Sequence, residues 1–151
     1  AWIAASLVVI AFAAWLIKRL CEEHLLVDAQ LVTALTLLLI SPVSWSHHWV
    51  WLTLIIPVFL YRAWSWLSTG WVAGSLLTVL VAWAGMLLTV PPKWWWGDQV
   101  DVHAMERYQK FWVDDFVWLT ILTVALFAAA FYASQRNNRN ANTATPAPLA
   151  S

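Results

Sequence analysis

The sequence predicts an all-α fold, a polytopic transmembrane helix bundle of about five spans. Composition is the first reason: 62% of the 151 residues are hydrophobic and 11% are charged, whereas a soluble domain is about 45–50% apolar and about 25% charged. The second is a mean hydropathy of +0.69. The third is the content of 14 tryptophans, since indole rings favour the membrane interface. The charges balance to zero, so no net field attracts nucleic acid, and we expect no nucleic-acid partner.

Five stretches are apolar and long enough, or nearly so, to cross a bilayer, which takes roughly 20 helical residues. They cover residues 1–17, 25–43, 49–67, 71–90 and 116–133. The second stretch is the least apolar at its ends, because it carries Asp28 and Gln30 in its first turns and Pro42 near its end. No apolar–polar alternation runs long enough to predict a strand. We therefore expect a transmembrane helical region over residues 1–134.

The remaining segments are polar. Residues 91–115 form one longer loop, rich in tryptophan and in charges of both signs. Residues 135–151 are small, polar and contain proline, which predicts a disordered tail. At the other end, an apolar run begins at Ala1 with no basic leader, so we expect the chain to begin inside a longer protein.

Orientation follows from the cationic residues. With five spans, five of the eight fall on one side: Lys18, Arg19, Arg62, Arg136 and Arg139. The other three, Lys93, Arg107 and Lys110, lie in the 91–115 loop. The positive-inside rule then predicts that the first group and the tail are cytoplasmic and that residues 41–49 and the loop face outward. We expect a multi-pass protein of the plasma membrane, in contact with the lipid bilayer.

The acidic residues near the second span have simpler interpretations. Glu22 and Glu23 fall on the cytoplasmic side and are typical of a solvated loop. Asp28 is either a functional acid within the membrane or, since it lies near a helix N-terminus, an end residue that the helix dipole stabilises.

The segment SPVSWSHHWVW, residues 41–51, holds the main candidate site. Its proline prevents an uninterrupted helix, and hydroxyls and imidazoles at a helix break suggest a lined cavity. The candidates that follow the proline are Ser44, Trp45, His47, His48 and Trp49. Adjacent histidines point about 100° apart on a helix, so both are not expected to serve one ligand in the same way. The alternative is two interfacial histidines that bond headgroups or backbone carbonyls.

The 91–115 loop is the second candidate, because aromatic and charged residues alternate there as on a surface that faces sugars or headgroups. Arg107 and Lys110 are three residues apart and on a helix would offer two cations to one phosphate. Asp98, Asp101 and His103 could bind a metal or move protons, but no spacing matches a strong metal motif, and we assign no metal ligand. The alternatives are a solvated interfacial helix for the charged residues and a membrane anchor for tryptophans such as Trp95.

Residues 37–52, LLLISPVSWSHHWVWL, closely resemble the SPxSWxHHWVW signature of glycosyltransferase family 87. Its members are polytopic C-type (GT-C) glycosyltransferases of actinobacteria, many of them polyprenyl-phosphomannose-dependent alpha-mannosyltransferases. The chain resembles the C-terminal part of such a protein. The resemblance implies a GT-C-like fold, an active site on the extracytoplasmic side, a polyprenyl-phosphate-linked mannose donor and a glycolipid acceptor of the phosphatidylinositol mannoside or lipomannan type.

The resemblance also implies residue roles. His47 and His48 would be the catalytic residues, stabilising the leaving phosphate or orienting the acceptor hydroxyl. The residues expected to bind substrate are Ser44, Trp45, Trp49, Trp95, Arg107 and Lys110. No cofactor is expected. The catalytic base of GT-C enzymes is usually an aspartate in the first outer loop, for which this chain has no corresponding segment, so the chain alone is expected to be inactive.

Two other classes stay open. A transporter would use His47 and His48 in a proton or substrate path, and it predicts ionisable residues buried mid-span and paired across helices. The predicted span interiors hold almost none. A non-catalytic membrane scaffold would also suit a chain that lacks the base-bearing loop.

Overall fold

The structure, a computed structural model, describes residues 2–40, 50–89 and 115–144. Its helices are α1 (Trp2–Glu22), α2 (Leu26–Ile40), α3 (Leu52–Ser65), the short 3-10 helix η2 (Leu67–Thr69), α4 (Trp71–Thr89) and α7 (Asp115–Ala144). Within these ranges there is no strand. The predicted all-α helical fold is therefore confirmed.

Each α-helix lies over one of the five predicted apolar stretches. Three contain segments long and apolar enough to cross a membrane, namely Ile3–Glu22, Trp71–Leu88 and Val117–Ala141. The other two, α2 and α3, are apolar but shorter, at 15 and 14 residues. These two helices flank residues 41–49, which lie outside the described part of the chain.

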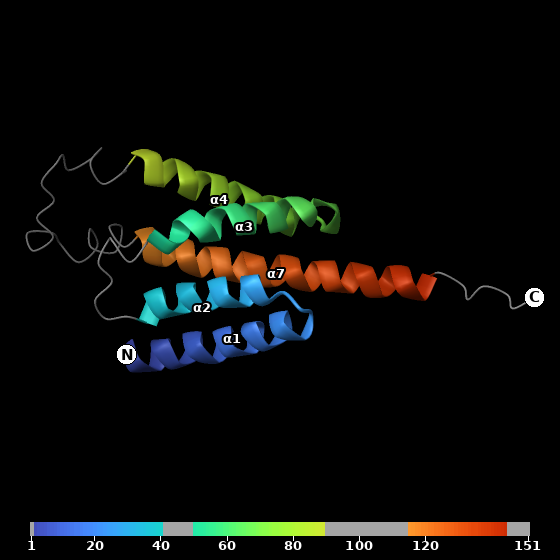
Figure 1. Cartoon of the computed structure of the whole chain (residues 1–151), viewed down its shortest axis with the longest axis horizontal. Helices are drawn as coiled ribbons and strands as arrows, with labels where there is room; N and C mark the ends of the chain where they lie inside the picture. The colour runs from blue at the N-terminus through green and yellow to red at the C-terminus, as the bar shows by residue number, and fades with distance from the viewer. Residues whose placement is uncertain (1, 41–49, 90–114, 145–151) are drawn as a thin grey trace, which may run out of the picture.

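The helices run side by side, with α7 between the α1–α2 pair and the α3–α4 pair (Figure 1). A shared core joins all five, and its largest side chains are aromatic. Phe59 of α3 stacks on Phe127 of α7 with ring centroids 4.2 Å apart, and Trp66 lies 5.4 Å from the same Phe127 ring. Apolar side chains also remain on the outside, such as Val8, 70% exposed, and Leu88, 86% exposed. Such an outer surface suits contact with lipid tails rather than water.

Both hairpins of the bundle turn at the same end (Figure 1). Between α1 and α2, His24 adopts the left-handed conformation with φ 58°, and the Leu25 N–H donates to the Leu20 carbonyl at 2.9 Å. This is the pattern that commonly ends a helix. Between η2 and α4, Gly70 has φ 124°, a backbone conformation that residues other than glycine rarely adopt.

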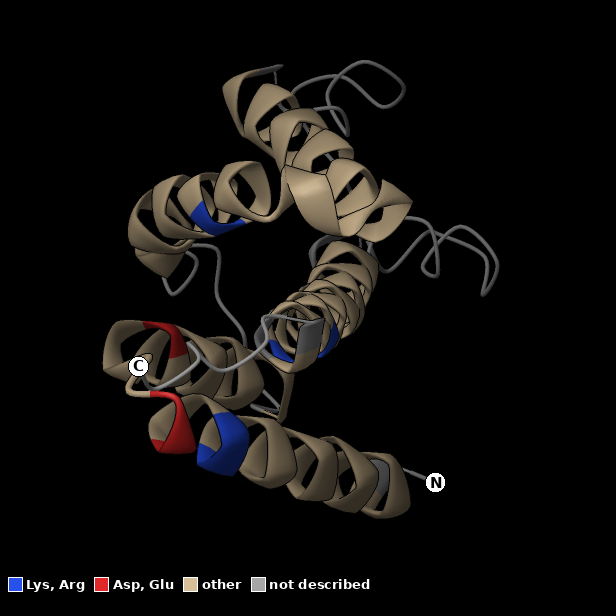
Figure 2. Cartoon of the chain, turned by 90° about the vertical axis from the view of Figure 1, so that its right-hand side faces the viewer, with Lys and Arg blue, Asp and Glu red and all other residues tan. Residues whose placement is uncertain are grey.

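Most described charges also lie at the end of these turns (Figure 2). We define the charged end by the residues Lys18, Arg19, Glu22, Glu23, Asp28, Arg62, Arg136 and Arg139. At the opposite end, the described residues include one charged residue, Asp115 at the start of α7. Every described lysine and arginine is thus at the charged end, as the predicted topology requires.

The predicted disordered tail is wrong for residues 135–144, because α7 continues to Ala144. Once a long helix exists, each further residue adds a hydrogen bond without a new nucleation cost. The residues from Gln135 to Thr145 include no glycine or proline to stop it, and the first helix breaker is Pro146.

Candidate functional site

The residues predicted to form the site lie outside the described part of the chain. They are Ser44, Trp45, His47, His48, Trp49, Trp95, Arg107 and Lys110. Their roles therefore stay predictions, and the structure contributes the framework that flanks them.

That framework is formed by four helix ends. The last residue of α2, Ile40, and the first of α3, Leu52, flank the histidine segment. Thr89 of α4 precedes the 91–115 loop, and Asp115, where that loop ends, is the first residue of α7. All four lie at the end of the bundle opposite the charged end (Figure 1). Both candidate segments are therefore attached to the bundle at one end, which a shared site requires.

The entry into α3 shows how the histidine segment joins the bundle. Val50 and Trp51 form a 3-10 turn that leads directly into the helix, and the Thr53 hydroxyl donates to the Val50 carbonyl at 2.7 Å. Leu52 is 1% exposed and joins the core. Pro57, inside α3, has no N–H to donate to the carbonyl one turn earlier. The first residues described after the histidines are thus fixed by a buried leucine and a local hydrogen bond.

At the charged end, a buried ion pair joins the same two helices. Arg62 of α3 donates from Nε to Asp28 Oδ1 at 2.8 Å and from Nη2 to Asp28 Oδ2 at 2.7 Å. The Asp28 side chain is fully buried and the Arg62 side chain is 26% exposed. Parallel bonds of this kind hold a guanidinium and a carboxylate in one geometry. Therefore α2 and α3 are linked at the end remote from the histidine segment.

This pair corrects the interpretation of Asp28 as an end residue stabilised by the helix dipole alone. Asp28 is buried against Arg62, which the sequence had placed only as one of the cytoplasmic cations. The two residues are 34 positions apart, so no helical spacing relates them. The order of the spans could have indicated the pair. An acidic residue in the first turn of one span and a basic residue in the last turn of the next lie at the same depth in the membrane, because the two spans run in opposite directions.

The described residues contain no group of three histidine, cysteine or carboxylate side chains that could hold a metal ion. The described histidine, His24, is exposed in the α1–α2 turn at the charged end. It therefore lies far along the bundle from the helix ends that flank the candidate segments.

The sequence is similar to those of several mycobacterial mannosyltransferases. The chain is 29% identical, over 99% of its length, to a polyprenol-phosphate-mannose-dependent alpha-(1-2)-phosphatidylinositol mannoside mannosyltransferase of Mycobacterium tuberculosis. A protein of the same name from Mycolicibacterium smegmatis is 36% identical over 52% of the chain. An alpha-(1-2)-phosphatidylinositol pentamannoside mannosyltransferase of Mycobacterium tuberculosis is 34% identical over 57% of the chain.

The chain is a homologue of these mannosyltransferases. It spans about a third of the length of the first relative (34%) and 20% and 17% of the other two. No protein-family model and no solved structure matches the chain.

The resemblance in residues 37–52 predicted relatives of this class, and that prediction is confirmed. Both the dependence on polyprenol-phosphate-mannose and the phosphatidylinositol mannoside acceptor appear in the relatives' names. The C-terminal position of the matched part within a mannosyltransferase stays a prediction.

Proposed function

We propose that the complete protein is a membrane mannosyltransferase. It moves a mannosyl residue from a polyprenyl-phosphate-linked donor to a glycolipid acceptor of the phosphatidylinositol mannoside type. The observation that carries this proposal is the similarity, over 99% of the chain, to a mycobacterial mannosyltransferase with that donor and acceptor in its name. The apolar helix surface supports it, because donor and acceptor are both lipids that reach an enzyme from the bilayer.

In the proposed reaction, an acceptor hydroxyl attacks the anomeric carbon of mannose. The bond from that carbon to the phosphate oxygen breaks, polyprenyl phosphate leaves, and the configuration inverts. Negative charge grows on the departing phosphate, so a histidine that donates a hydrogen bond there, or that orients the acceptor hydroxyl, lowers the barrier. We assign these roles to His47 and His48, with Arg107 or Lys110 as a further cation for the phosphate.

We place this site on the extracytoplasmic face of the plasma membrane. The support is the distribution of charge, since every described lysine and arginine lies at the charged end. The positive-inside rule assigns such an end to the cytoplasm. The helix ends that flank both candidate segments lie at the opposite end (Figure 1).

The test supplies radiolabelled polyprenyl-phosphomannose and phosphatidylinositol mannoside acceptors to membranes that carry the complete protein, and resolves the labelled glycolipids. We expect His47→Ala and His48→Ala each to lower mannosyl transfer at least about tenfold, a barrier change of about 1.4 kcal/mol. The matched control is His24→Asn, which removes an exposed imidazole at the charged end. Asparagine tolerates the left-handed conformation of residue 24, so this control should retain full transfer.

Full transfer by both single variants, at equal expression, would remove the histidines from the site. A complete protein that forms no labelled glycolipid would contradict the transferase assignment itself.

One observation bears on the transporter alternative, which predicts ionisable residues paired across helices. Asp28 and Arg62 form such an ion pair between α2 and α3. The pair lies in the first turn of α2 and the last turn of α3 rather than mid-span. This position favours a structural link over a transport path. The same assay separates the two classes, because a transporter would move the labelled lipid between leaflets without forming a new mannosylated product.

A further inference from the structure

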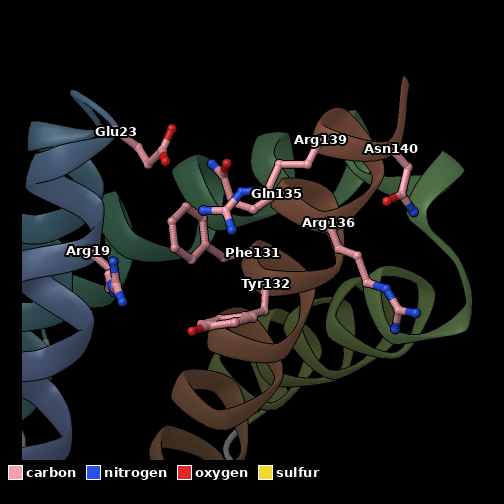
Figure 3. A pocket seen from close by; sticks show the side chains of 8 residues that line it. All are labelled: Arg19, Glu23, Phe131, Tyr132, Gln135, Arg136, Arg139 and Asn140. Carbon is pink, nitrogen blue, oxygen red and sulfur yellow. The ribbon is translucent and has the colours of Figure 1, made fainter. Parts of the chain in front are cut away.

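A cavity of about 290 Å³, lined by charged, amide and aromatic side chains, opens between α1 and α7 at the charged end. Arg19 of α1 and Glu23 of the turn after it line the cavity on one side, and Tyr132, Gln135, Arg136 and Arg139 are among its lining residues on α7 (Figure 3). The guanidinium of Arg139 and the ring of Tyr132 point toward α1, while Arg136 points to the other flank of α7 (Figure 3). The cavity therefore presents cationic and neutral hydrogen-bond donors from two helices.

The cavity has a small excess of positive charge. Two arginines, Arg19 and Arg139, face it on the side of α1 against one carboxylate, Glu23, and Arg136 lines it from the other flank of α7. Arg19 is partly neutralised by Glu22, at 3.0 Å. Among the described residues, no carboxylate lies within 4.0 Å of Arg136 or Arg139. Guanidinium groups without a carboxylate partner are well suited to a phosphate, which they bind through parallel hydrogen bonds.

An apolar groove of about 230 Å³ lies between α1, α2 and α7 nearer the middle of the bundle. Its lining residues include Val8 and Phe12 of α1, Thr36 and Leu39 of α2, and Val124 and Ala125 of α7. Val8 and Arg19 are 11 positions apart on α1, which corresponds to about 16 Å of helix. That length matches about half of a 30 Å hydrocarbon core. The cavity and the groove together thus have the length and polarity of one lipid in one leaflet.

An aromatic pair marks the level between the two. Trp15 of α1 stacks on Tyr132 of α7, with ring centroids 5.7 Å apart and an angle of 19° between the planes. Both residues are exposed, at 38% and 50%. Tryptophan and tyrosine concentrate where hydrocarbon meets headgroups. The charged cavity therefore lies at headgroup depth, and the groove lies at acyl-chain depth.

We propose that this α1–α7 seam binds one anionic phospholipid. Arg19 and Arg139 hold the phosphodiester of the headgroup, Gln135 donates a further hydrogen bond, and an acyl chain occupies the groove lined by Val124 and Ala125. Basic pockets between transmembrane helices favour anionic headgroups over zwitterionic ones, because no choline cation offsets the phosphate charge. The site lies at the opposite end of the bundle from the helix ends that flank the candidate segments, and it does not depend on the proposed mannosyl transfer.

The test is native mass spectrometry of the complete protein in detergent, with phosphatidylglycerol and phosphatidylcholine of identical chains added in equal amounts. We expect at least threefold more bound phosphatidylglycerol than phosphatidylcholine. Arg139→Gln and Arg19→Gln should each lower phosphatidylglycerol binding at least threefold. The matched control is Lys18→Gln, which makes the same charge change at the same end; Lys18 is 77% exposed and does not line the cavity.

A second pair of variants tests the groove. Ala125→Phe fills it from an exposed position and should lower phosphatidylglycerol binding, whereas Ala129→Phe, one turn further along α7, exposed and outside the groove, should not. Equal binding of both lipids, or an equal loss for Lys18→Gln and Arg139→Gln, would overturn the proposal. Displacement of phosphatidylglycerol by equimolar glycerol 3-phosphate would overturn it as well, since a soluble phosphate would then suffice.

Discussion

The buried ion pair between Asp28 and Arg62 predicts an asymmetric response to mutation. In Arg62→Leu, the fully buried Asp28 carboxylate loses its partner, and breaking a buried pair in this way costs about 3–5 kcal/mol. In Asp28→Leu, the remaining guanidinium is 26% exposed and lies in the last turn of α3. Such a side chain reaches water by extending its stem, so we expect a smaller loss, of about 1–2 kcal/mol.

The double variant Asp28→Leu/Arg62→Leu replaces the pair by two apolar side chains. Such replacements are often neutral or stabilising, because both desolvation penalties disappear. We therefore expect the double variant to lie within about 1 kcal/mol of the natural protein and the coupling energy of the cycle to be about 3 kcal/mol or more.

The measurement is denaturant-induced unfolding of the complete protein in detergent, followed by tryptophan fluorescence for all four members of the cycle. The control cycle uses Lys18→Gln and Glu22→Gln, an ion pair at 4.0 Å whose side chains are 77% and 45% exposed. Exposed pairs contribute about 0.2–1 kcal/mol. Coupling of less than 1 kcal/mol between Asp28 and Arg62, or equal losses for the two single variants, would refute the reasoning that burial of Asp28 dominates.

Four further predictions concern the core, a turn and the end of α7. Phe127→Ala, at a fully buried ring stacked on Phe59, should lower the free energy of unfolding by about 3–5 kcal/mol, and a loss below 1 kcal/mol would show that the stack is not formed. Thr123→Val should leave stability unchanged or raise it by up to about 1 kcal/mol in the same assay, since the buried Thr123 hydroxyl has no hydrogen-bond partner among the described residues; a large loss would reveal one. Gly70→Ala should cost about 1–3 kcal/mol purely through backbone strain, because a Cβ there would meet no atom within 4 Å; an unchanged unfolding midpoint would contradict the φ of 124°. Nitroxide labels at each position from 135 to 144 should show mobility with a period of about 3.6 residues in electron paramagnetic resonance spectra, and uniformly fast motion would mean that α7 ends before Gln135.

The fold class could be predicted because membrane helices are set by local composition. Each predicted apolar stretch contains a helix, since backbone groups in lipid must be satisfied within the segment itself. The predicted end of the last helix, before residue 135, was wrong because polar residues do not by themselves indicate disorder. The polar residues after Ser134, with Arg136 and Arg139 among them, continue a helix that is already formed.

The candidate site was predictable only in part. The histidine segment was found from its motif, and its residues lie outside the described part of the chain. The ion pair between Asp28 and Arg62 was missed, because it depends on how two helices pack rather than on either sequence alone. The same holds for the cavity between Arg19 and Arg139, which exists only because α1 lies beside α7.

The one-sided placement of charge also limits how the bundle can move. Sliding α1 or α7 lengthwise into the bilayer would carry Arg19 or Arg139 into hydrocarbon, at about 2.5–3.5 kcal/mol or more for each arginine that reaches the centre. The helix ends that flank the histidine segment and the 91–115 loop have one described charge between them, Asp115. Among the described residues, the bundle is therefore cheapest to open by a splaying of those sparsely charged helix ends, with the arginine-rich end as the pivot.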